Sequence, residues 1–365
     1  MTAPDDSRRP PPSWRTSAYD YALPEGLVAQ EPAARREDAR LLVVPRTGPH
    51  GHRDAAIPNL RDLLRPRDLL VVNETRVVPA RLPARRTGTG GRAEVLLLET
   101  EASGGVRVLL GTRGKPRPGE TINVAEGALV LTLKTALGHG EWRAGTDADP
   151  KEISAVLEAH GQIPLPPYIR RDDDDPRARA DRERYQTVYA RRDGAVAAPT
   201  AGLHLTPELL DDLDARGVRR AAVVLHVGPG TFRPVTAADL RLHPMHEEGF
   251  DVPPATAAAI ADTRDRGGRI VAVGTTVVRV LESAVRPTDP ALSLRTGPGR
   301  TTLFVHPPHL LRVCDALLTN FHAPRSTLLM LVAAMAGRER ILAAYRHAVR
   351  RRYRMLSYGD AMFIA

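Results

Sequence analysis

Polar side chains gather in five short segments where a hydrophobic core would not need them. The first is 197–206 (AAPTAGLHLT), in which a Pro-Thr-Ala-Gly loop leads to His204 just before a predicted helix. A histidine in this position lies beside backbone N–H groups, and its ring can exchange a proton near neutral pH. The segment therefore makes His204 a candidate acid or base.

The second segment, 225–235 (LHVGPGTFRPV), begins as an apolar strand and opens into a glycine-rich turn. It carries His226 and Arg233. Glycines allow the backbone to approach a ligand closely, and an arginine can bind a carboxylate or a phosphate through two hydrogen bonds. The pattern predicts a binding turn in which Arg233 contacts an anionic group.

The third segment, 242–248 (LHPMHEE), holds two histidines, including His246, and two glutamates. Such a group could bind a metal ion, but the H-E-x-x-H spacing of zinc proteases is absent. We therefore favour acid–base or hydrogen-bonding roles for His246. The alternative is that these side chains are ordinary surface residues.

The fourth segment, 271–283 (VAVGTTVVRVLES), is an apolar strand followed by a glycine turn and a helix. The turn is Gly274-Thr275-Thr276, and Arg279 lies one helical turn later. The N-terminus of a helix after a glycine turn can hold a carboxylate or ribose hydroxyls. Neither G-x-G-x-x-G nor the Walker pattern is present, so the segment indicates neither a dinucleotide nor ATP.

The fifth segment, 315–330 (DALLTNFHAPRSTLLM), has the order strand, polar loop, helix. This order places the loop at the carboxyl end of a strand, where α/β sheets hold ligands. A turn or a helix cap could explain each polar residue singly, but the density of the whole cluster favours a site. Its members are Asp315, Asn320, His322, Arg325 and Thr327.

Alternating strands and helices must position these segments. Apolar runs predict strands at 40–45, 68–73, 221–227, 269–273 and 311–319. Helical patterns lie at 151–160, 207–215, 254–266, 276–284, 327–335 and 339–352, with Thr206 as the N-cap of one of them. This alternation predicts an α/β (α+β) main domain built from 18–75 and 151–365.

The stretch 76–150 has a different character. Short alternating runs are separated by glycine-containing turns at intervals of about ten residues, which is typical of a small antiparallel barrel. We therefore predict an inserted β-barrel domain. Residues 1–17 are rich in Pro and Arg and are expected to form a disordered tail.

The net charge is +9, which favours an anionic partner, and nucleic acid is the first candidate. A basic helix near the C-terminus carries Arg350, Arg351 and Arg352, which could contact a nucleic-acid backbone or form a solvated face. The run of aspartates at 172–175 lacks ligand-like spacing and is interpreted as a solvated loop, so no metal site is predicted.

Membrane and secretory classes are not indicated. No run of about 18 apolar residues is present, and the N-terminal stretch lacks the apolar core of a signal peptide. The single cysteine, Cys314, lies among apolar residues and is expected to be buried. We expect a cytoplasmic monomer without a membrane partner.

The polar segments resemble those of the S-adenosylmethionine:tRNA ribosyltransferase-isomerase family of queuosine biosynthesis. The resemblance covers nearly the whole chain from Tyr19 and keeps the order of the family's motifs. Besides the segments above, it rests on YDYALPEGLVAQEP, DLLVVNETRVVPARL, HGQIPLPPYIRR, ERYQTVYARRDGAVAAPTAGLHLTPELL and RYRMLSYGDAMFI.

The resemblance implies a fold and a reaction. The fold is an α/β domain with an inserted β-barrel. In the reaction, the ribosyl group of S-adenosylmethionine is transferred and isomerised onto 7-aminomethyl-7-deazaguanine at the wobble position of a tRNA with a GUN anticodon. Epoxyqueuosine-tRNA forms, and adenine and methionine leave. S-adenosylmethionine is then a substrate, and no metal is implied.

This chemistry needs a base beside the sulfonium and a cationic partner for the methionine carboxylate. His204, His226, His246 and His322 all lie in family motifs, and which of them is the base stays open. Arg233, Arg279, Arg325 and the Gly274 turn could bind the carboxylate. Asp315, Tyr358 and Asp360 are further candidates.

The chain departs from the family pattern at Pro229 and at Pro308. These changes spare the polar cluster but touch expected edges of the acceptor site. Two alternatives follow, because a shared fold does not fix the substrate. The first is the same chemistry on a different base or a small molecule. The second is a non-catalytic tRNA-binding protein.

Overall fold

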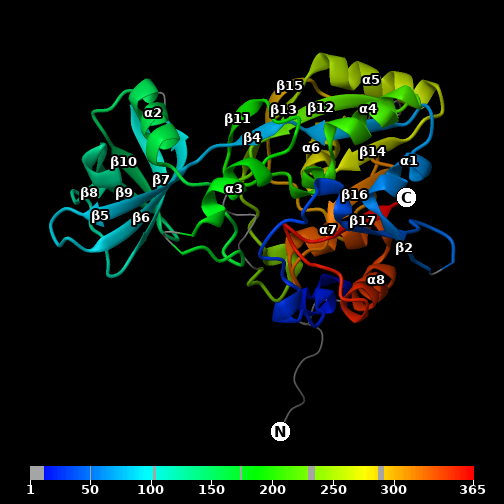
Figure 1. The fold of residues 1–365 in the computed structure, drawn as a ribbon, viewed down its shortest axis with the longest axis horizontal. Coiled ribbons are helices and arrows are strands. Elements are labelled where there is room, and N and C mark those ends of the chain that lie inside the picture. Colours follow the sequence, from blue (N-terminus) through cyan, green and yellow to red (C-terminus); the bar gives the residue numbers. More distant parts are fainter. Residues whose placement is uncertain (1–11, 50, 102–103, 173–174, 229–234, 287–291) are drawn as a thin grey trace, which may run out of the picture.

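The computed structural model describes residues 12–49, 51–101, 104–172, 175–228, 235–286 and 292–365. Figure 1 shows a small barrel beside a larger part that contains a broad sheet and most of the helices. The α/β architecture with an inserted antiparallel barrel is therefore confirmed.

The main sheet has nine strands in the order β15-β13-β12-β3-β14-β16-β17-β1-β2. Its centre is parallel, from β12 through β3 and β14 to β16. The strands are β1 (Arg40–Val44), β2 (Arg53–Ala56), β3 (Leu69–Asn73), β12 (Arg219–Leu225), β13 (Glu248–Val252), β14 (Ile270–Val273), β15 (Gly297–Thr301), β16 (Ala316–Asn320) and β17 (Ala361–Ile364).

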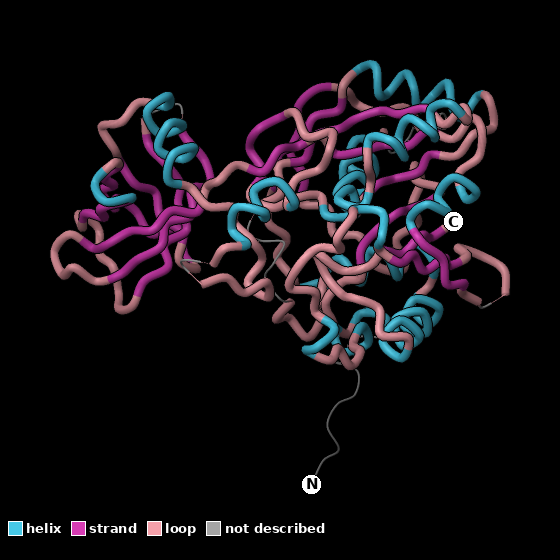
Figure 2. The backbone as a smooth tube through the Cα atoms, viewed as in Figure 1, coloured by secondary structure: helices cyan, strands magenta, loops and turns pink. Residues whose placement is uncertain are grey.

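Both faces of the central strands are covered, which explains their continuous apolar sequences. Side chains alternate along β3, so Leu69 and Val71 join one hydrophobic cluster while Leu70 and Val72 join another. Helices α5 to α8 pack on the first face, and α1 and α4 pack on the second. Figure 2 shows these helices on both sides of the strands.

The helices of the main part match most of the predicted ranges. They are α1 (Leu60–Leu63), α3 (Arg177–Arg184), α4 (Pro207–Ala215), α5 (Pro254–Asp265), α6 (Thr275–Ala284), α7 (Thr327–Ala336) and α8 (Arg338–Arg350). Thr206 caps α4 as predicted, because its side chain accepts a hydrogen bond from the backbone N–H of Leu209 at 3.1 Å.

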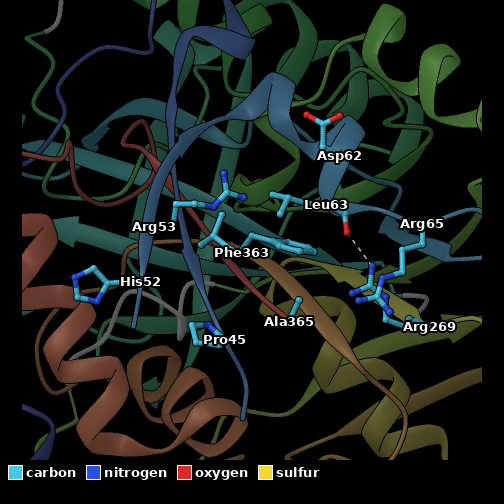
Figure 3. A pocket seen from close by; sticks show the side chains of 10 residues that line it. Pro45, His52, Arg53, Asp62, Leu63, Arg65, Arg269, Phe363 and Ala365 are labelled. Carbon is cyan, nitrogen blue, oxygen red and sulfur yellow. Dashed lines mark hydrogen bonds between the residues drawn. The ribbon is translucent and has the colours of Figure 1, made fainter. Parts of the chain in front are cut away.

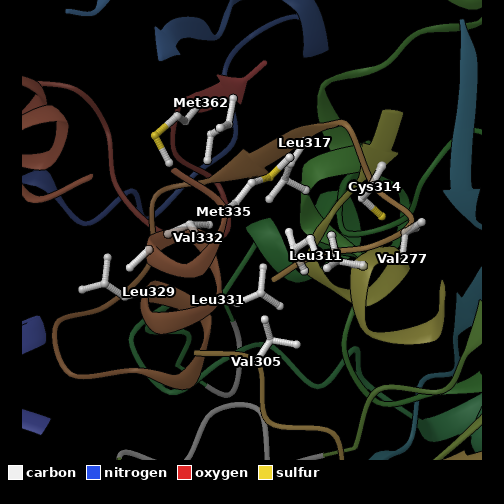
Figure 4. Close-up of a cluster of buried hydrophobic side chains, with 14 of the residues drawn as sticks. Val277, Val305, Leu311, Cys314, Leu317, Leu329, Leu331, Val332, Met335 and Met362 are labelled. Carbon is white, nitrogen blue, oxygen red and sulfur yellow. The ribbon is translucent and has the colours of Figure 1, made fainter. Parts of the chain in front are cut away.

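One predicted strand was too long. The range 311–319 becomes a strand only from Ala316, because a buried carboxylate organises the preceding residues as a loop. Glu282 of α6 accepts hydrogen bonds from the backbone N–H groups of Arg312 and Val313 at 2.9–3.0 Å. Cys314 is buried in the hydrophobic cluster beside this loop, as predicted, and Figure 4 shows it near Val277 and Leu311.

The barrel is closed by six antiparallel strands in the order β10-β7-β6-β5-β8-β9. They are β5 (Arg81–Arg86), β6 (Arg92–Thr100), β7 (Gly105–Thr112), β8 (Thr121–Val124), β9 (Leu129–Gly138) and β10 (Glu141–Gly145). Helix α2 (Pro150–His160) packs on the barrel core through Ile153. Strands β4 (Thr75–Val77) and β11 (Arg192–Ala195) form a separate two-stranded sheet at the junction.

The predicted disordered tail was too long. Residues 12–14 and 16–19 form short 3-10 helices, and Thr16 is buried. The backbone N–H of Thr16 donates to the carbonyl of Ala238 at 3.0 Å, and the Tyr19 hydroxyl donates to the carbonyl of Ser13 at 2.9 Å. The contact with Ala238 holds the segment against the main part, and the bond from Tyr19 to Ser13 orders the segment itself. Sequence composition does not reveal either contact.

Candidate active site

A cavity of about 180 Å³ lies at the carboxyl edge of the central strands. Strands β14 and β16 are parallel neighbours, with Val273 opposite Leu318, so the loops that follow them meet at this edge. The cavity thus unites the fourth and fifth polar segments with the loop of the first. Its polar and aromatic lining includes Tyr168, Tyr185, Thr200, Thr275, Thr276, Thr319, Asn320, His322, Ser326 and Ser357.

Two helices begin at the cavity. Gly274 precedes α6 with a φ of 93°, a conformation that favours glycine, and its N–H donates to the carbonyl of Leu318 at 2.8 Å. Ser326 caps α7 by accepting from the N–H of Leu329 at 3.2 Å. Both helix N-termini carry partial positive charge, so this edge favours an anionic or electron-rich group.

Asn320 presents an unsatisfied acceptor. Its Nδ2 donates to the carbonyls of Leu356 and Ser357 at 3.1 and 3.3 Å, which fixes the orientation of the amide. Within the described part of the chain, its buried Oδ1 has no hydrogen-bond partner, and neither has the buried Oγ1 of Thr276. Buried polar atoms without partners are rare, and in a cavity they indicate groups that a ligand would satisfy.

His322 is a buried and neutral histidine. The Thr319 hydroxyl lies 2.8 Å from its Nε2, and the Tyr345 hydroxyl accepts from its backbone N–H at 2.9 Å. Burial lowers the pKa of His322 to about 3, because the charged ring would lose its hydration. The ring is therefore uncharged at neutral pH and can accept a proton or donate a hydrogen bond.

His204 lies behind the cavity rather than in its lining. Its Nε2 is 3.3 Å from Nδ2 of Asn320, and the ring is buried in the short helix that ends the Pro-Thr-Ala-Gly loop. Burial, followed by the Arg36 and Arg354 charges, lowers the pKa of His204 to about 4. The structure thus brings His204 to the site as a neighbour of Asn320.

The sequence analysis did not identify two tyrosines that form an aromatic wall of the cavity. Tyr168 comes from the proline-rich loop and Tyr185 follows α3, and both line the cavity. The Tyr168 hydroxyl lies 2.7 Å from the hydroxyl of Ser357. Both tyrosines stand inside motifs that carried the family resemblance, but neither has a neighbour in sequence that would indicate chemistry.

Tyr358 supports this wall from behind. Its ring meets that of Tyr185 edge-on with centroids 5.7 Å apart, and its hydroxyl donates to Asp181 at 2.7 Å. Asp181 also accepts from Arg171 at 2.6 and 3.1 Å in a buried ion pair. Burial and the Asp181 carboxylate raise the pKa of Tyr358 well above its ordinary value.

A second, smaller cleft adjoins the cavity, and it holds three predicted residues. Arg279, His246 and Thr327 line it, and Leu328 lines both the cleft and the cavity. Arg279 is buried and forms an ion pair with Glu248. The third polar segment therefore approaches the site through its glutamate as well as through His246.

Other predicted residues lie away from the cavity. Asp315 stands before β16 at the opposite end of the strand, where it accepts from the N–H of Ile270 at 2.8 Å. Arg325 is exposed and pairs with Asp20. The direction of the strand explains the first placement, because only the carboxyl end of β16 and the loop after it reach the cavity.

Asp360 and His226 also serve other contacts. Asp360 is buried and accepts from the backbone N–H groups of Arg40 and Arg354 at 3.0 and 2.8 Å. His226 lies with Nδ1 2.9 Å from the hydroxyl of Thr75, and burial lowers its pKa. Asp360 therefore organises the chain around its own loop rather than the cavity.

The remaining predictions concern basic residues and one proline. Arg233 and Pro229 lie outside the described residues. Pro308 is exposed and is not part of the cavity lining. At the end of α8, Arg350, Arg351 and Arg352 are all exposed, and Arg351 approaches Asp54 at 3.5 Å.

Another hollow, of about 470 Å³, opens at the opposite edge of the sheet (Figure 3). It contains Arg53, Arg65 and Arg269, and Arg269 is paired with Asp68 at 2.6 Å. Because it lies beyond the amino ends of β14 and β16, it is separate from the polar cluster at the carboxyl edge.

The described ranges hold no group of three or more His, Cys, Asp or Glu side chains that could bind a metal ion. None of their helices is long and apolar enough to cross a membrane.

Comparison with known proteins identifies the family. The family model described as "Queuosine biosynthesis protein" matches residues 16–364. An S-adenosylmethionine:tRNA ribosyltransferase-isomerase from Anaeromyxobacter sp. (strain Fw109-5) is 53% identical over 357 residues, covering 96% of this chain and 99% of the relative. The chain belongs to the S-adenosylmethionine:tRNA ribosyltransferase-isomerase family. As a member of this family, it is an enzyme of queuosine biosynthesis.

Further relatives of the ribosyltransferase-isomerase family agree. The protein of that name from Gloeobacter violaceus is 49% identical, covering 100% of this chain and 98% of the relative. The crystal structure of the S-adenosylmethionine tRNA ribosyltransferase from Thermotoga maritima is 36% identical, with a TM-score of 0.54, covering 96% of this chain and 100% of that one. The family predicted from the motifs is thus confirmed.

Proposed function

We propose that this enzyme transfers and isomerises the ribosyl group of S-adenosylmethionine onto 7-aminomethyl-7-deazaguanine in a tRNA with a GUN anticodon. The products are epoxyqueuosine-tRNA, adenine and methionine, and a tRNA substrate implies reaction in the cytoplasm. The observation that carries the proposal is the cavity at the carboxyl edge of β14 and β16. This cavity brings together the neutral His322, the unpartnered oxygens of Asn320 and Thr276, and the N-termini of α6 and α7.

His322 is the base that this geometry supports best. It lines the cavity and is neutral, whereas His204 lies behind Asn320 and His226 contacts Thr75. A buried imidazole of low pKa is a weak base, so it needs an acidified proton. The positive sulfur of S-adenosylmethionine supplies one, because a sulfonium acidifies the neighbouring carbon.

Asn320 and the tyrosine wall suit a purine-like ring. The free Oδ1 of Asn320 can accept from an exocyclic amine, and the rings of Tyr168 and Tyr185 provide surfaces for stacking. Adenine carries such an amine, and the deazaguanine acceptor carries others. We assign this wall to base binding, and Thr276 Oγ1 to a ribose hydroxyl.

The test is a product assay. The purified enzyme is incubated with S-adenosylmethionine and tRNA bearing 7-aminomethyl-7-deazaguanine, and adenine, methionine and tRNA nucleosides are measured by mass spectrometry. Adenine release together with epoxyqueuosine in the tRNA is expected. Adenine release only with a free deazapurine would indicate a different acceptor. Binding of tRNA without adenine release would indicate a non-catalytic protein.

A further inference from the structure

The smaller cleft beside the cavity, called here the Arg279 cleft, is defined by Glu248, Arg279, Phe304, Thr327 and Leu328. It continues the cavity in two ways. Leu328 lines both. Arg279 also lies three residues after Thr276 on α6, so their side chains stand about 5–6 Å apart on one helix face. A ligand in the cavity could therefore extend a short flexible arm into the Arg279 cleft.

Arg279 is held rigidly but is not fully satisfied. Its side chain is 8% exposed and forms an ion pair with Glu248. Its Nε donates to the carbonyl of Leu303 at 3.3 Å. Among the described residues, its buried Nη2 has no hydrogen-bond partner. A buried guanidinium N–H without an acceptor is costly, so this atom indicates a missing acceptor.

The N-terminus of α7 faces the same cleft. Thr327, the first residue of this ten-residue helix, lines it together with Leu328. The Ser326 side chain caps the N–H of Leu329, and the helix directs its N-terminal partial positive charge toward the cleft. The helix end and Arg279 Nη2 are independent donors that suit one small anion.

Charge balance specifies which anion fits. Glu248 already compensates Arg279, and it also accepts from the N–H of Gly228 at 3.2 Å. A lone anion would gain from Arg279 but would be repelled by Glu248. A zwitterion avoids this conflict, because its ammonium lies near the carboxylate of Glu248 while its own carboxylate binds the guanidinium. An α-amino acid has this arrangement of charges.

We infer that the Arg279 cleft binds the α-amino-acid end of S-adenosylmethionine, with the carboxylate on Arg279 Nη2 and the α7 N-terminus. Glu248 is a positioning residue that orients the guanidinium and balances the ammonium. Phe304 supplies an apolar wall for the methylene chain. This inference rests on the proposed function and adds how the donor substrate is recognised.

The first test uses the unmodified enzyme. Binding of S-adenosylmethionine and of decarboxylated S-adenosylmethionine, which lacks only the carboxylate, is compared by calorimetry. Loss of a charge-assisted contact predicts that the decarboxylated compound binds about 10- to 100-fold more weakly. Equal affinities would overturn the inference and leave the proposed function intact. Binding of neither compound, with no adenine release, would instead count against the proposed function.

The second test uses a paired substitution. Glu248→Gln with Arg279→Gln keeps the shapes and leaves no buried charge unpaired. The matched control is Glu247→Gln with Arg300→Gln, because this neighbouring pair, at 2.5 Å, is exposed. The first variant is expected to bind both compounds equally, and the control to discriminate like the wild type. A folded Glu248/Arg279 variant that still discriminates would overturn the inference. If that variant fails to fold, the comparison of ligands on the wild type decides.

Discussion

Asn320 Nδ2 lies 3.3 Å from His204 Nε2, so the histidine is one layer behind the cavity that Asn320 lines. The same Nδ2 donates to two backbone carbonyls of the loop before Tyr358. His204 and that loop therefore fix which face of the amide is presented. The Oδ1 of Asn320, an acceptor, has no hydrogen-bond partner among the described residues, and we propose that His204 acts through Asn320 as a positioning residue.

Replacement of His322 by alanine should abolish turnover. Removal of a positioned base costs about 10²- to 10⁴-fold in kcat, while binding of S-adenosylmethionine should change little. Adenine release under saturating substrate measures the first effect and calorimetry the second. His226→Ala is the control histidine, because it contacts Thr75 outside the cavity. Near-normal turnover of the His322 variant would remove His322 from the chemistry.

The value of kcat/KM should not fall around pH 6.5, where an ordinary histidine becomes protonated. Burial lowers the pKa of His322 to about 3, so the free enzyme already holds the neutral ring from pH 5 to pH 8. Rates with saturating tRNA are measured across this range, after confirming that the enzyme stays folded at each pH. A fall of kcat/KM around pH 6.5 that is absent from the His322 variant would show that the His322 ring titrates normally.

The free energy of unfolding should fall as the pH drops below about 6.5, which is the ordinary pKa of histidine. His204 and His322 have lowered pKa values, about 4 and about 3, so between these values and 6.5 only the unfolded chain binds their protons. Within this pH range, each ring lowers the free energy of unfolding by about 1.4 kcal/mol per pH unit. Urea unfolding at pH 7 and pH 5 measures this loss. His204→Asn should have a shallower pH slope, and an unchanged slope would contradict the assignment.

Tyr358→Phe should weaken the packing of the aromatic wall, because it removes the hydrogen bond from Tyr358 to Asp181. The hydroxyl donates to the buried Asp181 carboxylate at 2.7 Å, and a hydrogen bond to a charged group contributes about 2 kcal/mol. We expect a lower unfolding free energy and a raised KM with kcat nearly unchanged. Tyr353→Phe is the matched control, because its hydroxyl donates to Asp54, away from the cavity. Equal effects of both variants on KM would deny Tyr358 a positioning role.

Replacement of Arg351 and Arg352 by alanine should weaken tRNA binding. Both side chains are exposed at the end of α8. Each phosphate contact contributes about 0.9 to the slope of log affinity against log salt, so the slope should fall by about one to two. Titrations from 50 to about 200 mM salt measure it. The control is the Arg61/Arg216 double variant, because Arg61 lies in α1 and Arg216 follows α4, away from α8. An unchanged slope would make this end of α8 a solvated face.

The sequence by itself determined the architecture and pointed to the candidate site at the carboxyl edge of the sheet. Apolar runs at β3, β14 and β16 predicted strands of an α/β domain, and the order strand, polar loop, helix predicted a site at a carboxyl end. Local rules sufficed here, because strand period, helix caps and glycine turns are properties of neighbouring residues. Asn320, His322 and the Gly274 turn were therefore found in the cavity.

Only the tertiary structure decided which residues of each polar segment line the cavity. Tyr168, Tyr185 and Ser357 come from three segments of the chain, and long-range contacts bring these segments together. The hydroxyls of Tyr168 and Ser357 lie 2.7 Å apart, and the Tyr358 hydroxyl donates to Asp181 at 2.7 Å. Asp315 and Asp360 were predicted for the site but satisfy backbone N–H groups elsewhere. The direction of a side chain and its burial depend on neighbours far away in sequence. For the same reason, the neutral state of His322 and the unpaired Nη2 of Arg279 appear only once the chain is packed.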